Sequence, residues 1–322
     1  MRSTRPQHAY LVTDLSTRRG HSDHISLALI TRSALEHPAF DCDLSLSRYH
    51  ALMKTDNLDI LLIGGGKMGG AMLAAWRELG VASIAIVDPA PDARALIAPG
   101  VTVYSGVGDL PPEFRPSVIV VAVKPQVAAS ALPPCRELAA GTLVISVMAG
   151  QTLANLATLL GPSARLVRAM PNTPAAIRQG ITVAVQGTDI GQESRALASV
   201  LLESIGEVAW IEDEAQIDAV TAVSGSGPAY VFLLAEALEQ AALAEGLSPD
   251  LARRLARATV SGAGNLLRAS AESATQLRLN VTSPGGTTAA ALAVLMPELG
   301  SLMTRAVAAA AARSRALSAP TK

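Results

Sequence analysis

A short stretch of the chain, residues 58–69, reads L-D-I-L-L-I-G-G-G-K-M-G. Its first half is an apolar run apart from Asp59, as expected for a strand that is buried on both faces of a parallel sheet. Its second half has the spacing G-x-G-x-x-G at Gly64, Gly66 and Gly69, and an apolar helical period follows to Leu79. A strand, a glycine turn and a helix in this order are typical of the first unit of a dinucleotide-binding domain.

Each of these glycines has a physical role in such a turn. The first permits the tight bend, the second lets the backbone approach a pyrophosphate, and the third lets helix and strand pack closely. The helix N-terminus adds free N–H groups and the positive end of the helix dipole. An ordinary glycine turn is the alternative. We expect cofactor contacts from the whole turn: Gly64, Gly65, Gly66, Lys67, Met68 and Gly69.

The rest of the chain divides into two parts with different patterns. Six more apolar runs of strand length follow, mostly separated by helical segments, at residues 83–87, 117–123, 142–148, 166–170, 181–185 and 208–211. Alternating strands and helices predict a parallel, doubly wound sheet. Beyond Glu212 the pattern predicts only helices, at 215–246 and 248–270 and in two stretches after the turn S-P-G-G-T-T at 283–288. We expect an α/β protein, with an N-terminal Rossmann-like domain at 57–212 and an all-α dimerisation domain at 213–318.

Residues 1–56 differ from everything that follows. They mix Arg, Ser, Thr, Asp and His around one short apolar patch at 25–30. We expect a disordered extension, and Met53, just before the first strand, is an alternative start of the protein. All five histidines fall within the first fifty residues. The main fold therefore has no imidazole for acid–base catalysis, and we expect no metal site in it.

The composition excludes several classes of protein. A net charge of −1 argues against a nucleic-acid surface, which needs clustered Lys and Arg. The two cysteines, Cys42 and Cys135, cannot build a disulfide framework, which indicates the cytoplasm. No uninterrupted apolar run reaches the roughly 20 residues that span a bilayer, so we expect no membrane partner. The C-terminal helices are apolar all round, and we expect a second subunit to cover them.

Three further segments stand at the ends of predicted strands, where ligands bind in such sheets. Asp88 follows the second strand at the place where an acid meets the ribose of NAD, although it is also a good turn or cap residue. Pro89 follows it, and Arg94 is near enough to meet a 2′-phosphate, so the cofactor is NADPH or NADH. The other segments are Ala122, Val123, Lys124 and Pro125, and then Met148, Ala149 and Gly150. A solvated lysine is the alternative for Lys124, whereas the small residues at 149–150 suit a nicotinamide close to the backbone.

Together with R-A-M-P-N-T-P at 168–174, V-S-G-S-G-P-A-Y at 223–230 and V-T-S-P-G-G-T-T at 281–288, these segments resemble the pyrroline-5-carboxylate reductase family over residues 57–317. The resemblance implies reduction of a cyclic imine by NADPH or NADH to give L-proline, the last step of proline biosynthesis. It also implies a homodimer through the C-terminal helices, often within a larger ring of dimers.

The resemblance also implies roles for individual residues. Thr288 would hold the substrate carboxylate with the backbone of Gly286 and Thr287, and Thr221 would line the pocket from the long helix. Two more residues, Glu214 and Asn280, fall on positions that the family places near substrate or cofactor. The sequence departs from the family at two places, since Lys67 stands where Asn is usual and Leu279 where an acid is usual.

The chemistry of these segments agrees with an anionic substrate. Glycines and hydroxyls before a helix, as in S-P-G-G-T-T, expose N–H groups to a carboxylate, although a plain capped helix start has the same composition. The segment S-G-S-G-P at 224–228 interrupts a helix at a cost of about 1 kcal/mol for an interior glycine and about 3 for a proline. Close packing or nicotinamide access explains that cost, and a simple kink is the alternative.

The stretch from Trp210 to Thr321 contains neither His nor Lys. Oxidation of an alcohol needs a group that takes the hydroxyl proton, typically His or Lys. A protonated cyclic imine is already electrophilic, so positioning and a carboxylate anchor suffice. The pattern favours imine reduction over a β-hydroxyacid-dehydrogenase-like oxidoreductase, which uses a Lys on the long helix. A non-catalytic nucleotide-binding protein is the third alternative.

Overall fold

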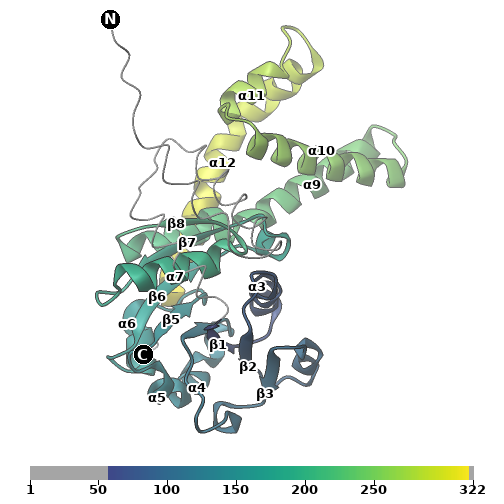
Figure 1. Cartoon of the computed structure of the whole chain (residues 1–322). Coiled ribbons are helices and arrows are strands. Elements are labelled where there is room, and N and C mark those ends of the chain that lie inside the picture. Colours follow the sequence, from purple (N-terminus) through teal and green to yellow (C-terminus); the bar gives the residue numbers. More distant parts are fainter. Residues whose placement is uncertain (1–56, 319–322) are drawn as a thin grey trace, which may run out of the picture. The chain divides into compact units, whose positions relative to one another are not determined.

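The structure is a computed structural model that describes residues 57–318 (Figure 1). These residues lie within one compact unit of the chain. The expected extension at 1–56, the alternative start at Met53 and the five histidines lie outside the described residues.

Within the described residues, the strands form one eight-stranded sheet in the order β3-β2-β1-β4-β5-β6-β7-β8. The six strands from β1 to β6 are parallel to one another, which confirms the doubly wound arrangement. The strands are β1 Asp59–Ile63, β2 Ser83–Val87, β3 Val101–Tyr104, β4 Val118–Val121, β5 Leu143–Ser146, β6 Arg165–Met170, β7 Gly180–Gln186 and β8 Gly206–Trp210.

Two features of the sheet differ from the expectation. Strand β7 runs antiparallel to β6, and β8 is parallel to β7, so the sheet is not parallel throughout. The connection from β6 to β7 carries only the 3-10 turn η7, Thr173–Ile177, and so short a link suits an antiparallel neighbour, because a parallel one needs a crossover of a dozen residues or so. The edge strand β3 was missed, because it has four residues and only its first is buried.

Helices cover the sheet on both faces. Alternate residues of β1 enter different cores, Ile60 and Leu62 on one side and Leu61 and Ile63 on the other. The first core includes side chains of α3 and α7, and the second those of α4, α5 and α6. These helices are α3 Lys67–Glu78, α4 Ala128–Ala131, α5 Arg136–Ala139, α6 Leu153–Leu160 and α7 Gln192–Glu203, and short 3-10 turns are η3 Pro91–Leu96, η4 Val107–Asp109, η5 Pro125–Val127 and η6 Pro133–Cys135.

After β8 the described chain is helical, as expected. It comprises η8 Glu214–Gln216, α8 Ile217–Val220, the π-helical turn η9 Thr221–Gly225, α9 Gly227–Ala244, α10 Pro249–Ala269, α11 Ala274–Asn280 and α12 Thr287–Ser318. The start of α10 is the predicted one, with the Ser248 hydroxyl accepting a hydrogen bond from the N–H of Leu251 at 3.4 Å. The expectation of two helices after 288 was wrong, because α12 continues for 32 residues through Pro297, a residue type that usually ends a helix.

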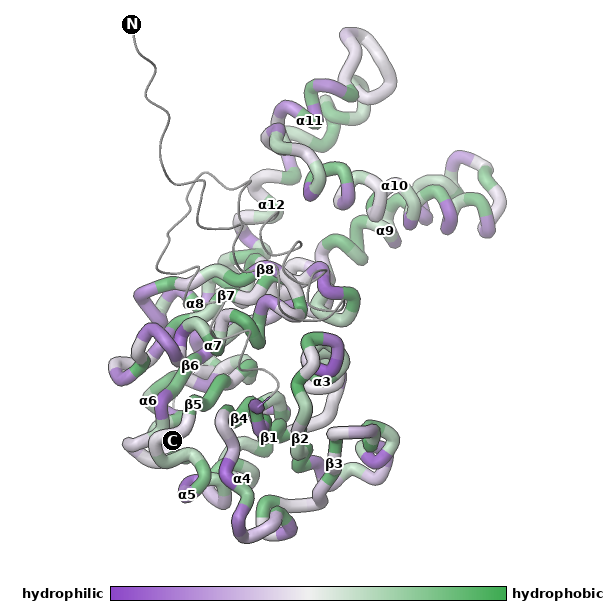
Figure 2. The backbone as a smooth tube through the Cα atoms, viewed as in Figure 1, coloured by the Kyte–Doolittle hydropathy of each residue, from purple (hydrophilic) through white to green (hydrophobic). Residues whose placement is uncertain are grey.

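The C-terminal helices expose much of their apolar surface. None of the residues of α9 is buried, and Figure 2 shows long hydrophobic stretches along this helix. Among the described residues, the segments Glu214–Ala244 and Thr287–Ser318 are long and apolar enough to cross a membrane, judged by length and composition. The reasoning that excluded a membrane span from the sequence therefore does not hold for these two helices, and what covers them needs a separate argument.

The Trp76 side chain joins the glycine-turn helix to α7. Its ring is fully buried, and its Nε1–H donates to the carbonyl oxygen of Leu201 at 3.0 Å. We expect Trp76→Phe to lower the free energy of unfolding by about 1–3 kcal/mol, because the smaller ring leaves space in the core and a buried hydrogen bond is lost. Urea unfolding followed by far-UV circular dichroism measures this loss. The control is Trp210→Phe, whose lost hydrogen bond goes to the rotatable hydroxyl of Ser199, and a loss as large in this control would contradict the prediction.

Candidate cofactor and substrate site

The glycine turn after β1 has two glycines that are required by packing and one that is open. Gly64 has a φ of +99°, and a Cβ on it would lie 2.9 Å from the backbone nitrogen of Val123. A Cβ on Gly69 would lie 2.1 Å from the carbonyl oxygen of Gly64, whereas a Cβ on Gly66 would meet nothing within 4 Å. Gly66 precedes α3, and no side chain caps that helix. Its first N–H groups therefore face open space, which fits a pyrophosphate.

The predicted cofactor residues gather at one edge of the sheet. The glycine turn, Asp88, the segment 122–125 and the segment 148–150 follow β1, β2, β4 and β5, which are parallel, so all lie at the carboxyl end. The segment 122–125 also contacts the turn, because Ala122 and Val123 are the neighbours that a Cβ at Gly69 or Gly64 would meet. An open glycine, an uncapped helix and exposed Lys67 and Lys124 fit a dinucleotide at this edge.

Asp88 uses both of its carboxylate oxygens within the chain. Its Oδ2 accepts a hydrogen bond from the N–H of Gly65 at 2.7 Å, and its Oδ1 accepts one from the N–H of Ala90 at 2.9 Å. Asp88 therefore ties the end of β2 to the glycine turn, which is the turn-residue alternative of the sequence analysis. Arg94 in η3 is exposed.

The segment V-S-G-S-G-P-A-Y spans the end of the π-helical turn η9 and the start of α9, and Gly225 of the turn lies against Met170 at the end of β6. Such turns are frequent at functional sites. A Cβ on Gly225 would lie 2.8 Å from Cε of Met170, so the glycine permits a close approach and the interruption is more than a kink. Thr221 begins this turn, and its hydroxyl donates to the carbonyl oxygen of Ile217 at 2.8 Å.

A cavity of about 460 Å³ lies beside the π-helical turn. Asn172 and Pro174, from the loop after β6, line one part of it, and residues from η9 to α9 such as Tyr230 and Phe232 line another. Met303 of α12 completes the wall. The cavity thus brings together two of the motifs that carry the resemblance, whereas Thr221 and Thr288 are not among its lining residues.

The predicted carboxylate turn lies at the start of α12. Gly285 has a φ of +69°, and the N–H of Gly286 donates to the carbonyl oxygen of Ser283 at 3.0 Å. Thr287 is exposed and Thr288 half-buried, and the first N–H groups of a helix have no intrahelical acceptor. In Figure 1 this end of α12 lies beside α11 and away from β1. The chain therefore does not bring the turn to its own glycine turn.

Asn280 has polar partners although no acid stands at position 279. Its Nδ2 donates to Oε2 of Glu272 at 3.0 Å, and its Oδ1 accepts from Nε2 of Gln276 at 2.7 Å. Leu279 is 51% exposed. The missing acid therefore does not leave Asn280 free, because Glu272 occupies part of its hydrogen-bonding capacity.

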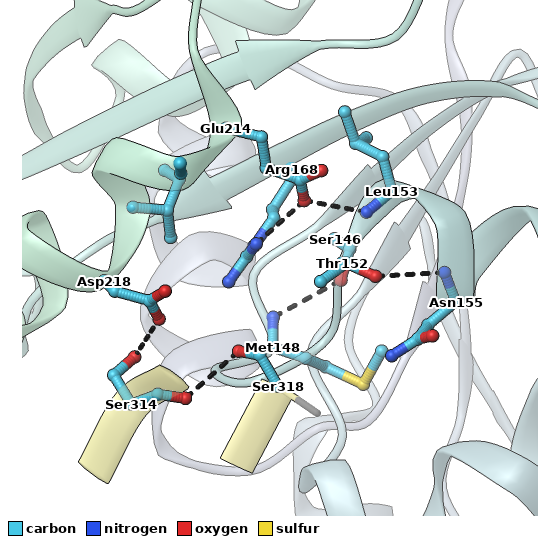
Figure 3. A network of polar contacts seen from close by, with 12 residues as sticks. Ser146, Met148, Thr152, Leu153, Asn155, Arg168, Glu214, Asp218, Ser314 and Ser318 are labelled. Carbon is cyan, nitrogen blue, oxygen red and sulfur yellow. Dashed lines mark hydrogen bonds and ion pairs between the residues drawn. The ribbon is translucent and has the colours of Figure 1, made fainter. Parts of the chain in front are cut away.

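Glu214 joins a partly buried ion pair, which is drawn in Figure 3. Its Oε1 lies 2.8 Å from Nη1 of Arg168 and accepts a second hydrogen bond, also of 2.8 Å, from the N–H of Leu153. Arg168 is almost fully buried, with 4% of its side chain exposed. The contact joins β6, the start of α6 and η8, directly beside the predicted nicotinamide segment.

A second polar contact in Figure 3 holds the end of α12. The hydroxyl of Ser314 donates to Oδ1 of Asp218 at 2.5 Å. A Cβ on Gly150 would lie 3.4 Å from Leu317, so the last turn of α12 lies against Gly150, the end of the predicted nicotinamide segment. Met148 and Gly150 are buried, and Ala149 is half-buried.

The sequence analysis assigned no role to three residues of this network, Arg168, Asp218 and Ser314. Arg168 could have been suspected, because it is a charge inside the apolar run L-V-R-A-M, and a buried charge needs a partner. Nothing in the local pattern indicates that Asp218 and Ser314, 96 positions apart, meet.

Other reactive groups contribute little. Within residues 57–318 no cluster of His, Cys, Asp or Glu could hold a metal ion. Burial raises the pKa of the Cys135 thiol to about 11, so this side chain is a thiol at neutral pH and a poor nucleophile.

Two family models match the chain. The model described as pyrroline-5-carboxylate reductase dimerisation matches residues 214–317. The model described as NADP oxidoreductase, coenzyme F420-dependent, matches residues 59–150. The two matches fall on the C-terminal helices and on the strands and turns of the cofactor edge.

Relatives and solved structures agree with these matches. The pyrroline-5-carboxylate reductase of Pseudomonas aeruginosa is 39% identical over 72% of this chain and 86% of its own length. That of Pisum sativum is also 39% identical, over 82% of this chain and 97% of its own length. A solved pyrroline-5-carboxylate reductase from Coxiella burnetii has a TM-score of 0.75 and 34% identity, over 82% of this chain and 99% of that chain. The Plasmodium falciparum enzyme, solved with NADP bound, has a TM-score of 0.71 and 28% identity, over 82% and 100%. With its cofactor edge and its C-terminal helices matched in this way, the chain belongs to the pyrroline-5-carboxylate reductase family.

Proposed function

We propose that this protein reduces 1-pyrroline-5-carboxylate to L-proline, with NADPH or NADH as the reductant. The observation that carries the proposal is the open glycine turn at the carboxyl edge of the sheet, where Gly66 and the uncapped start of α3 leave room for a pyrophosphate. Membership in the family supplies the substrate class. The chain has only two cysteines and so cannot build a disulfide framework, which supports a cytoplasmic location.

The described residues bind and orient rather than transfer protons. The first N–H groups of α3 and Lys124 would hold the phosphates and ribose, and Gly286, Thr287 and Thr288 would hold the substrate carboxylate with Asn280 nearby. The bound reduced nicotinamide supplies the hydride. A protonated imine accepts hydride without a general acid, so it is adequate that the C-terminal part, residues 210–321, offers neither His nor Lys to the substrate. Thr221 would form part of the pocket wall. Its hydroxyl donates to the carbonyl oxygen of Ile217, so we do not assign it as the proton donor to the imine nitrogen.

A second copy of the chain would complete this site. The carboxylate turn starts a helix whose apolar residues, such as Val294 and Met296, are exposed, and it lies away from the glycine turn of its own chain (Figure 1). A dimer through α9 to α12 would cover these faces and bring the turn of one subunit toward the cofactor edge of its partner. The start of the first apolar segment is also tied to β6 through Glu214, and the end of α12 is tied to α8 through Ser314, which favours a partner subunit over a membrane.

The reaction is tested by following the absorbance of NADPH and of NADH, separately, with pyrroline-5-carboxylate as substrate. We expect cofactor oxidation that depends on the imine, with proline formed in equal amount. A chain that begins at Met53 should turn over as the full chain does. Cofactor binding without turnover in both chains would contradict the reductase and favour a non-catalytic nucleotide-binding protein, whereas turnover of a hydroxyacid alone would favour the dehydrogenase alternative.

The carboxylate role of the turn is tested by Thr288→Ala. We expect the KM for the imine to rise about tenfold or more, because a hydrogen bond to a charged group is lost, while the KM for the cofactor changes little. Steady-state kinetics with each substrate varied in turn measures both constants. Thr304→Ala, which removes a hydroxyl from the same helix where it only bonds the carbonyl oxygen of Gly300, is the control. Equal increases of both KM values would contradict the assignment.

The dimer is tested by placing a charge on the exposed apolar face. Leu233 of α9 is 64% exposed, and we expect Leu233→Asp to weaken dimerisation by about 100-fold, because an unpaired charge is costly in a dry interface. Light scattering after size-exclusion chromatography measures the mass. Ile97→Asp, at a residue 58% exposed beside η3, should leave the dimer intact. A wild-type protein that stays monomeric without detergent would contradict the proposed interface.

A further inference from the structure

The segment between β5 and α6 has to present its backbone at the cofactor edge. It contains Gly150, whose φ of +70° is left-handed, and small residues that restrain it little. Ser146, the last residue of β5, pairs in register with Arg168 of β6. Arg168 therefore lies beside the point where the chain leaves the sheet and enters this segment.

One carboxylate oxygen fastens the other end of the segment. Oε1 of Glu214 accepts two hydrogen bonds of 2.8 Å, one from Nη1 of Arg168 and one from the N–H of Leu153. Leu153 is the first residue of α6, and the Thr152 hydroxyl accepts from the N–H of Asn155 at 3.1 Å in the same turn. The negative charge lies at the positive end of the helix dipole, which adds to the attraction.

Stability alone is a weak reason for this ion pair. Burying the arginine and part of the carboxylate costs solvation that their attraction only partly returns, and apolar residues of the same volume often stabilise a fold as well. What the pair adds is geometry, because a carboxylate shared between a strand and a helix start sets the distance between them. Ala149 and Leu153 also pack against Met170 and Ile217, so the segment rests on the same elements that carry the pair.

We propose that Arg168 and Glu214 are positioning residues for the nicotinamide half of the cofactor site. They hold the start of α6, and through it residues 148–150, against the end of β6, while Asp218 and Ser314 hold the end of α12 over Gly150 (Figure 3). Glu214 thus acts through the backbone of this segment instead of touching the substrate. The proposal rests on the function proposed above, because it assigns the segment to the nicotinamide.

The test compares two ligands that differ in the nicotinamide alone. NADPH carries it, and 2′-phospho-ADP-ribose lacks it while keeping every phosphate (NADH and ADP-ribose are the pair if the protein prefers NADH). We expect Glu214→Ala to weaken the affinity for NADPH by about tenfold. The affinity for 2′-phospho-ADP-ribose should stay within about twofold of the wild-type value, because the glycine turn is unchanged. Isothermal titration calorimetry measures both affinities. In turnover, kcat should fall by about 10- to 100-fold, since a displacement of about 1 Å has effects of this size.

Milder variants grade the effect. Glu214→Gln keeps an acceptor for the N–H of Leu153 and should restore part of the NADPH affinity, and Arg168→Lys keeps the charge and should do the same. If Glu214→Ala does not fold, the affinities of Glu214→Gln and Arg168→Lys for NADPH and for the fragment decide the proposal in the same way. The matched control is Glu212→Ala, two residues away, which removes an exposed partner 3.8 Å from Arg195 and should change neither affinity.

Each outcome decides the proposal. Equal weakening of NADPH and of the fragment would show a general structural role and overturn it, as would unchanged NADPH affinity in a folded Glu214→Ala protein. Absence of imine reduction by the wild-type protein would overturn the proposed function instead, and the comparison of the two affinities would still decide whether the pair positions the nicotinamide segment.

Discussion

Helix α3 approaches the end of β1 so closely that only glycine fits at position 69, where a Cβ would lie 2.1 Å from the carbonyl oxygen of Gly64. This approach places the first N–H groups of the helix at the carboxyl edge of the sheet, where Gly66 leaves open space. The Trp76 hydrogen bond to α7 and the Asp88 hydrogen bond to Gly65 hold the helix and the turn from either side. The proposed cofactor edge depends on this contact, because it presents the first backbone donors of α3 where we place the pyrophosphate.

The segment 148–150, which we assign to the nicotinamide, is held by a different kind of interaction. Backbone donors and small residues form the phosphate side, whereas a buried arginine and a carboxylate tie the 148–150 segment to β6. The carboxylate comes from the first turn after β8, at the junction of the sheet with the C-terminal helices. A change in the packing of these helices would therefore reach the cofactor through Glu214, and through Ser314 at the end of α12.

The C-terminal helices are the reason why we propose that one chain is an incomplete enzyme. Many of their apolar residues stay exposed although α9 packs beside α10, and α9 has no buried residue. A helix that is apolar all round needs burial, and the dimerisation match over residues 214–317 indicates the means. The same helices would satisfy a criterion for membrane spans, so composition alone does not distinguish a dimer interface from a bilayer segment. The polar attachments of Glu214 to β6 and of Ser314 to α8 are the reason why we propose a dimer interface.

The sequence alone was sufficient for the strand–turn–helix unit, the doubly wound order, the helical C-terminal part and the family, because these depend on local patterns of apolar residues, glycine and proline. It was insufficient for the reversed β7 and β8, for the short edge strand β3 and for the unbroken α12, where neighbours overrule local preference. The partners of Asp88, Arg168 and Glu214 were also beyond it. A charged residue in an apolar run of the sequence indicates that it needs a partner. Only the tertiary structure decides which residue is the partner, because the hydrogen-bonding atoms come from elements far apart along the chain.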